Sequence, residues 1–171
     1  GLVSQITKLL HQAYAPLAKA GMKYLATHQS DEVTLKRLTE GESFLAFCDD
    51  ELAGTISLKE EKGGTCNHYR KNGVIVFGQF GIAPQFQGKR IGALMMSVVE
   101  KRATERGFDE IALDTSEHAK DLIATYTRRG YRFIEFAQWT VTNYRSVIMS
   151  KSLADIRRHD GPYRIPETQV V

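Results

Sequence analysis

The chain has 171 residues, a length typical of one domain and sufficient to bury a full hydrophobic core. Hydrophobic residues make up 42% and charged residues 25% of the composition, which excludes a disordered chain or a coiled coil for the whole sequence. The 23 basic and 20 acidic residues give a net charge of +3, too even a balance to indicate a nucleic-acid-binding protein.

Cysteine content and hydropathy favour a cytoplasmic protein. Cys48 and Cys66 are too few for a disulfide framework, which favours a reducing compartment. The longest nearly apolar stretch, residues 91–99, is shorter than the roughly 20 residues that a membrane span needs. The first residues do not have the pattern of a signal peptide. We therefore expect no contact with membrane or nucleic acid.

The first half of the chain is predicted to form two helices and then three strands. Apolar residues first recur every three or four positions, the spacing of helices, and then alternate, the spacing of strands. Asp49-Asp50-Glu51 is the expected hairpin turn, and residues 59–73 are a charged, glycine-rich loop. Glycines in the third strand suggest a bulge or a close backbone approach. The predicted helices are 2–19 and 31–39, and the predicted strands are 43–48, 52–58 and 74–82.

The second half is predicted to alternate helix and strand and to end in an antiparallel pair. A strand–helix–strand unit implies a parallel crossover, so the sheet is expected to be mixed, with helices packed on it. We expect one domain over residues 1–153 and a polar tail over 154–171, whose strand-like end, 168–171, could pair with a sheet edge. The predicted elements are a helix from 91 to a cap at Gly107, a strand at 110–114, a helix at 120–129, and strands at 131–139 and 146–153.

The turn that follows the third strand has the composition of an anion site. Gln87-Gly88-Lys89-Arg90 leads into the first turn of a helix, whose N–H groups lack internal partners. These groups and the helix dipole favour a diphosphate. Gly88 permits close approach of the backbone, and Gly92 removes a side chain one turn into the helix. The glycine spacing matches neither a mononucleotide loop nor a dinucleotide fingerprint. Taken alone, the segment also fits an ordinary solvated turn.

Two motifs together resemble the GNAT acetyltransferase superfamily. Gln87-Gly88-Lys89-Arg90-Ile91-Gly92 is similar to the family's Gln/Arg-x-x-Gly-x-Gly/Ala signature, with Arg90 where the first glycine usually lies. Residues 124–132 resemble the family's helix that carries a tyrosine, here Tyr126, shortly before Gly-Phe or Gly-Tyr. The closing strand at 149–153 is also similar. The resemblance covers roughly residues 1–153, although the family normally opens with a strand and usually has an asparagine where this chain has Ala119.

The resemblance implies an α/β fold with a mixed, centrally splayed sheet flanked by helices, and an N-acetyltransferase that uses acetyl-CoA and no metal. Pantetheine would lie between the strands at 74–82 and 110–114, and an amine would attack the acetyl carbonyl directly. Tyr126 would protonate the departing thiolate, although it also fits a core tyrosine. The residues expected to bind the acetyl-CoA are Phe80, Gly81, Ile82, Gln87, Gly88, Lys89, Arg90, Ile91, Gly92 and Ala119.

The sequence leaves the general base and the acceptor open. A carboxylate, a histidine or an ordered water could accept the proton, and the candidate side chains are Asp114, Glu117 and His118, followed by His68 and Glu135. In the family, the last hairpin loop, with Trp139, Tyr144 and Arg145, and the segment from Tyr14 to Tyr24 often border the acceptor pocket, although simple packing explains them equally well. An aminoglycoside, a polyamine, an amino acid or a protein amine would each fit such a pocket.

Three other interpretations stand beside this one. A non-catalytic acyl-CoA-binding sensor or docking module would share the diphosphate turn and would not need Tyr126. A basic nucleic-acid binder would show a steep salt dependence, which the small net charge disfavours. Cys66-Asn67-His68 lacks the further ligands that zinc needs, so we expect a surface loop there. A homodimer is compatible with the resemblance, which leaves the oligomeric state open.

Overall fold

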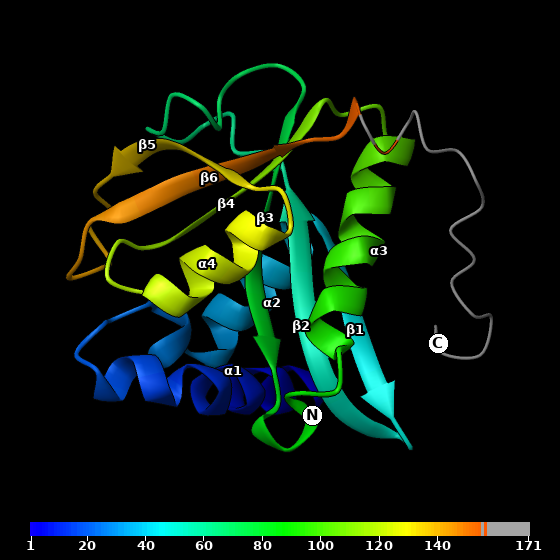
Figure 1. Cartoon of the computed structure of the whole chain (residues 1–171). Coiled ribbons are helices and arrows are strands. Elements are labelled where there is room, and N and C mark those ends of the chain that lie inside the picture. The colour runs from blue at the N-terminus through cyan, green and yellow to red at the C-terminus, as the bar shows by residue number, and fades with distance from the viewer. Residues whose placement is uncertain (155, 157–171) are drawn as a thin grey trace.

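The computed structural model describes residues 1–154 and 156, which form a six-stranded mixed sheet with helices on both faces (Figure 1). The elements follow the predicted order, and their ends differ from the predicted bounds by at most two residues. The predicted tail lies outside the described residues except for 154 and 156, as does its strand-like end at 168–171. The elements are α1 (Leu2–Lys19), η1 (Leu25–Thr27), α2 (Asp31–Thr39), β1 (Glu42–Cys48), β2 (Glu51–Lys59), β3 (Val74–Ile82), η2 (Pro84–Phe86), α3 (Ile91–Glu105), β4 (Glu110–Ser116), α4 (Lys120–Arg128), β5 (Arg132–Ala137) and β6 (Ser146–Ser152).

The strand order is β1-β2-β3-β4-β6-β5. β3 and β4 pair in parallel, as the strand–helix–strand pattern predicts, and the other neighbours pair antiparallel. β6 lies between β4 and β5, so the last strand of the described chain reaches the middle of one half of the sheet. Within the described residues, none of the helices is both long and apolar enough to cross a membrane.

Two faces of the sheet are covered by different elements. Ile75 and Phe77 of β3 and Leu113 of β4 pack against α3 and α4, which lie in front of the sheet in Figure 1. The alternate positions, such as Val76 and Ala112, face the loop 60–73 on the other side. On that side, α1 and α2 cover the part of the sheet formed by β1 to β3.

The centre of the sheet is split. β3 and β4 are paired only over Val74–Val76 and Glu110–Ala112, and beyond these residues the two strands separate. Figure 1 shows the half made of β1, β2 and β3 fanning away from the half made of β4, β6 and β5, with α4 in front of the gap. The splayed sheet expected from the resemblance is therefore present.

A bulge in β3 lies beside this split. Two steps along β2, from Thr55 to Ser57, are matched by three steps along β3, from Gly81 to Gly78, so β3 carries one extra residue. The left-handed residue of the bulge is Gln79, with φ of 45°, rather than one of the glycines that suggested the bulge. Its side chain is held in place because it accepts a hydrogen bond from Gln29 Nε2 at 2.9 Å.

Candidate active site

The N-terminus of α3 presents free backbone N–H groups at the end of an exposed turn. The first helical hydrogen bond of α3 runs from the Leu94 N–H to the Arg90 carbonyl, at 3.0 Å. The N–H groups of residues 91–93 therefore have no acceptor in the helix. Gly88 and Arg90 both take left-handed conformations, with φ of 77° and 65°. Arg90 thus adopts the backbone shape that explains a glycine at this position in the family signature. The turn fits an anion such as a diphosphate.

The predicted contacts at 80–82 lie next to this helix end. A Cβ atom at Gly92 would lie 3.5 Å from Phe80 Cζ and 3.6 Å from Ile82 Cγ1, which is ordinary contact. The Phe80 carbonyl accepts a hydrogen bond from Tyr14 Oη at 2.8 Å, and the Ile82 carbonyl accepts one from Gln87 Nε2 at 3.1 Å. Most of the predicted contacts for a CoA chain therefore gather around one helix end.

Gly81 and Ala119 differ from this group. An ideal Cβ at Gly81 would approach Leu10 Cδ2 to 3.1 Å, so the missing side chain allows α1 to pack on β3. Ala119 is buried at the start of α4, on the β4 side of the split, and its N–H donates to the Ser116 carbonyl at 3.0 Å. The Ala119 carbonyl also has a partner, because it accepts from the Ile123 N–H at 3.0 Å.

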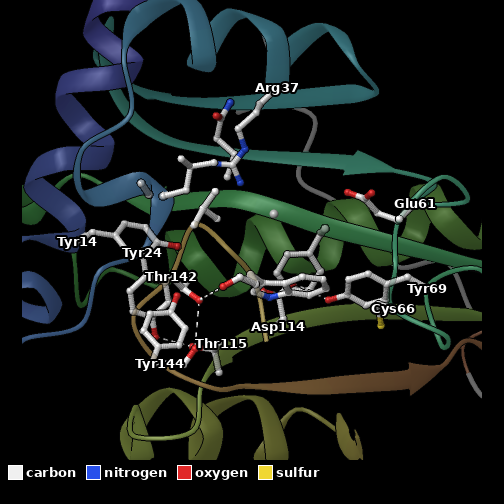
Figure 2. Close-up of a pocket in the computed structure, with 18 of the residues that line it drawn as sticks. Tyr14, Tyr24, Arg37, Glu61, Cys66, Tyr69, Asp114, Thr115, Thr142 and Tyr144 are labelled. Carbon is white, nitrogen blue, oxygen red and sulfur yellow. Dashed lines mark hydrogen bonds between the residues drawn. The ribbon is translucent and has the colours of Figure 1, made fainter. Parts of the chain in front are cut away.

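A cavity of about 340 Å³ crosses the split between β3 and β4. Figure 2 shows Arg37 entering from α2 on one side and Asp114 from β4 on the opposite side. Aromatic residues occupy one end, and the loop 60–73 closes the other. The lining residues whose side chains carry polar atoms are Tyr14, Tyr24, Arg37, Glu61, Thr65, Cys66, Tyr69, Gln79, Asp114, Thr115, Tyr126, Trp139, Thr142 and Tyr144.

Tyr126 reaches the cavity from α4, on the face of the sheet that α3 also covers. Its ring packs edge-on against Phe77 and Tyr131, with centroids 6.2 and 6.0 Å away, and the side chain is 9% exposed. Among the described residues, its hydroxyl has no hydrogen-bond partner. Burial raises the pKa of Tyr126 well above its ordinary value of 10.0, and the charge of Asp114 adds to the effect. The phenol therefore stays protonated at neutral pH and can donate its proton to a ligand.

Asp114 reaches the cavity from the opposite face of the sheet. The Tyr69 hydroxyl donates to Asp114 Oδ1 at 2.7 Å, and Trp139 Nε1 donates to Oδ2 at 3.0 Å. The cavity gives water access to this carboxylate. The surrounding protein nevertheless disfavours the charged form, which raises the pKa of Asp114 above its ordinary 3.8. The hydrogen bonds from Tyr69 and Trp139 and the charge of Arg37 act in the opposite direction. A carboxylate with a raised pKa and no ion pair is well suited to accept a proton from an amine.

Three tyrosines form the aromatic end of the cavity. Tyr24 packs between Tyr14 and Tyr144, with centroid distances of 5.3 and 4.8 Å. The Tyr24 hydroxyl is fixed by Thr115 Oγ1 at 2.8 Å and by the Ser116 N–H at 3.1 Å. Tyr14, Tyr24 and Tyr144 therefore form an aromatic wall at this end of the cavity.

The other candidate bases lie away from the cavity. Glu117 accepts from Arg145 Nη2 at 2.7 Å, and His118 is exposed beside it. His68 is buried 3.7 Å from Glu110 with both ring nitrogens lacking hydrogen bonds, and Glu135 accepts from the His68 N–H. None of these four side chains lines the cavity, so Asp114 is the candidate base that the structure places there.

Two sequence expectations need correction. Cys66 and His68 belong to a loop, as expected, but their side chains are 6% and 4% exposed because they pack under the sheet rather than on the surface. Arg145 lies outside the cavity, where it pairs with Glu117 and places its guanidinium 3.6 Å from the centre of the Phe136 ring. Across residues 1–154 and 156, His, Cys, Asp and Glu form no cluster that could hold a metal ion.

Sequence reasoning missed Arg37, Tyr69 and Glu61. Arg37 lies on α2 beside another basic residue, Lys36, and nothing in the local pattern distinguishes the two. Tyr69 and Glu61 lie in the charged loop 60–73, whose composition indicates only an irregular connection. The one available signal was Tyr69, because an aromatic residue in a charged, glycine-rich loop indicates that part of the loop packs against the protein.

Comparison with known proteins agrees with this fold. The acetyltransferase (GNAT) family profile matches residues 5–131. The S-(2-succino)cysteine N-acetyltransferase of Bacillus subtilis (strain 168) is 26% identical over 129 residues, 74% of this chain and 76% of that protein.

Solved structures share the fold at lower sequence identity. The ribosomal-protein-S18-alanine N-acetyltransferase from Escherichia coli superposes with a TM-score of 0.67 at 12% identity, over 88% of this chain and 87% of that one. The PaiA N-acetyltransferase from Thermoplasma acidophilum, in complex with coenzyme A, gives 0.64 at 16% identity, over 88% of this chain and 92% of that one.

Proposed function

This chain belongs to the GNAT acetyltransferase family, and we propose that it moves an acetyl group from acetyl-CoA to the amine of a small molecule by direct transfer. One observation carries the proposal. A single cavity crosses the split sheet, with the Tyr126 phenol on one side and the Asp114 carboxylate on the other. A thioester between the strands would thus have a proton donor and a proton acceptor within one cavity.

The donor site is supported by the turn before α3. The free N–H groups of residues 91–93, together with the exposed Lys89 and Arg90, suit the diphosphate of acetyl-CoA. The pantetheine arm would then extend along the unpaired part of β3, past the bulge at Gln79, toward the cavity. Ala119 has no side-chain donor and its N–H already donates to the Ser116 carbonyl, so the proposal does not depend on a contact from that position.

Asp114 and Tyr126 together account for the protons that the acetyl transfer moves. Asp114 takes one proton from the ammonium of the acceptor, and the freed nitrogen lone pair forms a bond to the acetyl carbon. The C–S bond breaks, and Tyr126 gives its proton to the sulfur. The second proton displaced from nitrogen restores the phenol, and Asp114 releases its proton to solvent. No covalent bond to the protein forms, so neither cysteine takes part.

The acceptor is expected to be a small molecule. The Bacillus subtilis relative acts, by its name, on a cysteine derivative. The cavity of about 340 Å³ has the size of a small-ligand pocket rather than of a groove for a protein surface. Both facts favour a small amine over a protein for this chain.

Thiol release from acetyl-CoA, measured over a panel of small amines, tests the proposal. We expect release that depends on the amine, with double-reciprocal plots that intersect when both substrates are varied. Parallel lines would indicate an acetyl-enzyme and contradict direct transfer. Tight binding of CoA without thiol release over the whole panel would instead favour a non-catalytic acyl-CoA-binding module.

A further inference from the structure

Arg37 brings a positive charge into the cavity without a carboxylate to balance it. The residue lines the cavity from α2, and in the described part of the chain its guanidinium makes no ion pair. A partly buried cation that lacks an acidic partner is costly, and burial here lowers the pKa of Arg37. The cost is explained if a ligand supplies the missing anion.

The guanidinium is held in a fixed position. Arg37 Nη1 donates to Gln29 Oε1 at 2.7 Å, and Gln29 is itself buried and bonded to Thr34 and Gln79. On the other side, Arg37 Nη2 lies over Gly78, where a Cβ atom would approach it to 3.6 Å. The network thus places the guanidinium beside the β3 bulge and leaves donor positions directed at the cavity, as Figure 2 shows.

The opposite side of the same cavity carries the opposite charge. Asp114 faces Arg37 across the space and, among the described residues, forms no ion pair; its two oxygens accept from Tyr69 and Trp139. The third charged residue of the lining, Glu61, is paired with Lys59 at 2.9 Å. The cavity therefore separates one unpaired cation from one carboxylate, an arrangement that is complementary to a zwitterion.

We propose that the acceptor is an amino acid or a close derivative, whose carboxylate binds Arg37 while its amine faces Asp114. This inference rests on the proposed function, because it assigns the acceptor of that reaction. The planar guanidinium matches a carboxylate with two parallel hydrogen bonds, which also orients the neighbouring amine. The tyrosine wall contacts the remainder of the acceptor.

The test compares amines that differ only in the carboxylate. The standard amino acids and S-carboxymethylcysteine are assayed with acetyl-CoA, and the best of them is compared with its methyl ester and its decarboxylated amine. We expect a kcat/KM for the amino acid roughly 10- to 100-fold above that of the other two, the range typical of a hydrogen bond to a charged group.

Variants of Arg37 assign this preference to one residue. Arg37→Gln should remove most of the preference, raise KM for the amino acid and leave KM for acetyl-CoA unchanged, whereas Arg37→Lys should retain part of it. Arg145→Gln is the matched control, because Arg145 is a cation outside the cavity, and it should keep the full preference. The same ligands are also tested for thermal stabilisation of each CoA-saturated protein.

The outcomes separate the two proposals. Equal turnover of amino acid and ester, or an equal loss on both in Arg37→Gln, overturns the amino-acid acceptor and leaves acetyl transfer standing. Stabilisation by the amino acid alone, lost in Arg37→Gln and without turnover of any amine, supports the Arg37 site and overturns the transferase. If no amine is turned over and no amino acid stabilises the protein, both proposals are overturned.

Discussion

Tyr126 is expected to act in the chemical step rather than in binding. Its hydroxyl has no partner among the described residues, while its ring packs against Phe77 and Tyr131. Tyr126→Phe keeps the ring contacts and removes only the hydroxyl group that carries the acidic proton. We expect kcat to fall by about 10²- to 10⁴-fold with little change in the Kd of CoA. An unchanged kcat at saturating substrate would show that another group protonates the thiolate.

Asp114 determines the expected acid limb of the pH profile. A base works only when deprotonated, so kcat/KM should rise as pH increases through the Asp114 pKa, which lies above its ordinary 3.8. The pKa of Tyr126 lies well above 10.0, so the acid keeps its proton over the same range. Asp114→Asn should lower kcat by about 10²-fold or more and abolish that limb. An intact limb in this variant would assign the base elsewhere.

The same substitution should not weaken the fold. Because the native pKa of Asp114 is raised, the folded state binds a proton more readily than the unfolded state, and stability from this residue is lost as pH rises from 3.8 through the native pKa. Asp114→Asn carries no charge and can still bond Tyr69 and Trp139. Its melting temperature should equal or exceed that of the wild type at pH 8, with a smaller difference at pH 5. A lower melting temperature at pH 8 would mean that the carboxylate stabilises the fold.

At the scale of elements, local patterns predicted most of the fold and only part of the site. Helical spacing in α1 and alternation in β1 and β2 are encoded by neighbouring residues, so their bounds could be predicted closely. The insertion of β6 between β4 and β5 depends on distant pairing and leaves no local signal. Arg37 and Tyr69 meet Asp114 only because α2 and the loop 60–73 fold over the same face of the sheet, which no periodicity encodes.

The N-terminus of α3 is predicted to bind the diphosphate through its backbone, and Gly92 allows a charge test. The protein itself has room for a side chain there, since a Cβ atom would make only ordinary contacts with Phe80 and Ile82. Gly92→Asp should weaken CoA binding at least about 10-fold more than Gly92→Asn, because the two differ mainly in charge next to an anion. Titration calorimetry measures both. Equal affinities would show that the diphosphate lies elsewhere.

At the scale of the whole molecule, the split is expected to couple the binding of acetyl-CoA to the stability of the sheet. The two halves are joined along β3 and β4 by three residue pairs, from Val74 to Val76 on β3, and the remainder of both strands has no partner across the gap. A ligand inserted there would replace the missing strand contacts. Binding of acetyl-CoA should therefore be felt by both halves and not only by the turn at residues 87–92.

Hydrogen exchange and thermal unfolding measure this coupling together. At about 100 times its Kd, acetyl-CoA should stabilise the fold by about 2.7 kcal/mol, or roughly 5–10 °C for a chain of this size. Amides of β3 beyond Val76 and of β4 beyond Ala112 should gain protection along with the start of α3, and Gly92→Asp should reduce both effects. Protection confined to the start of α3 would mean that the CoA arm lies outside the split. The thioester would then not lie between Asp114 and Tyr126, which would contradict their proposed roles.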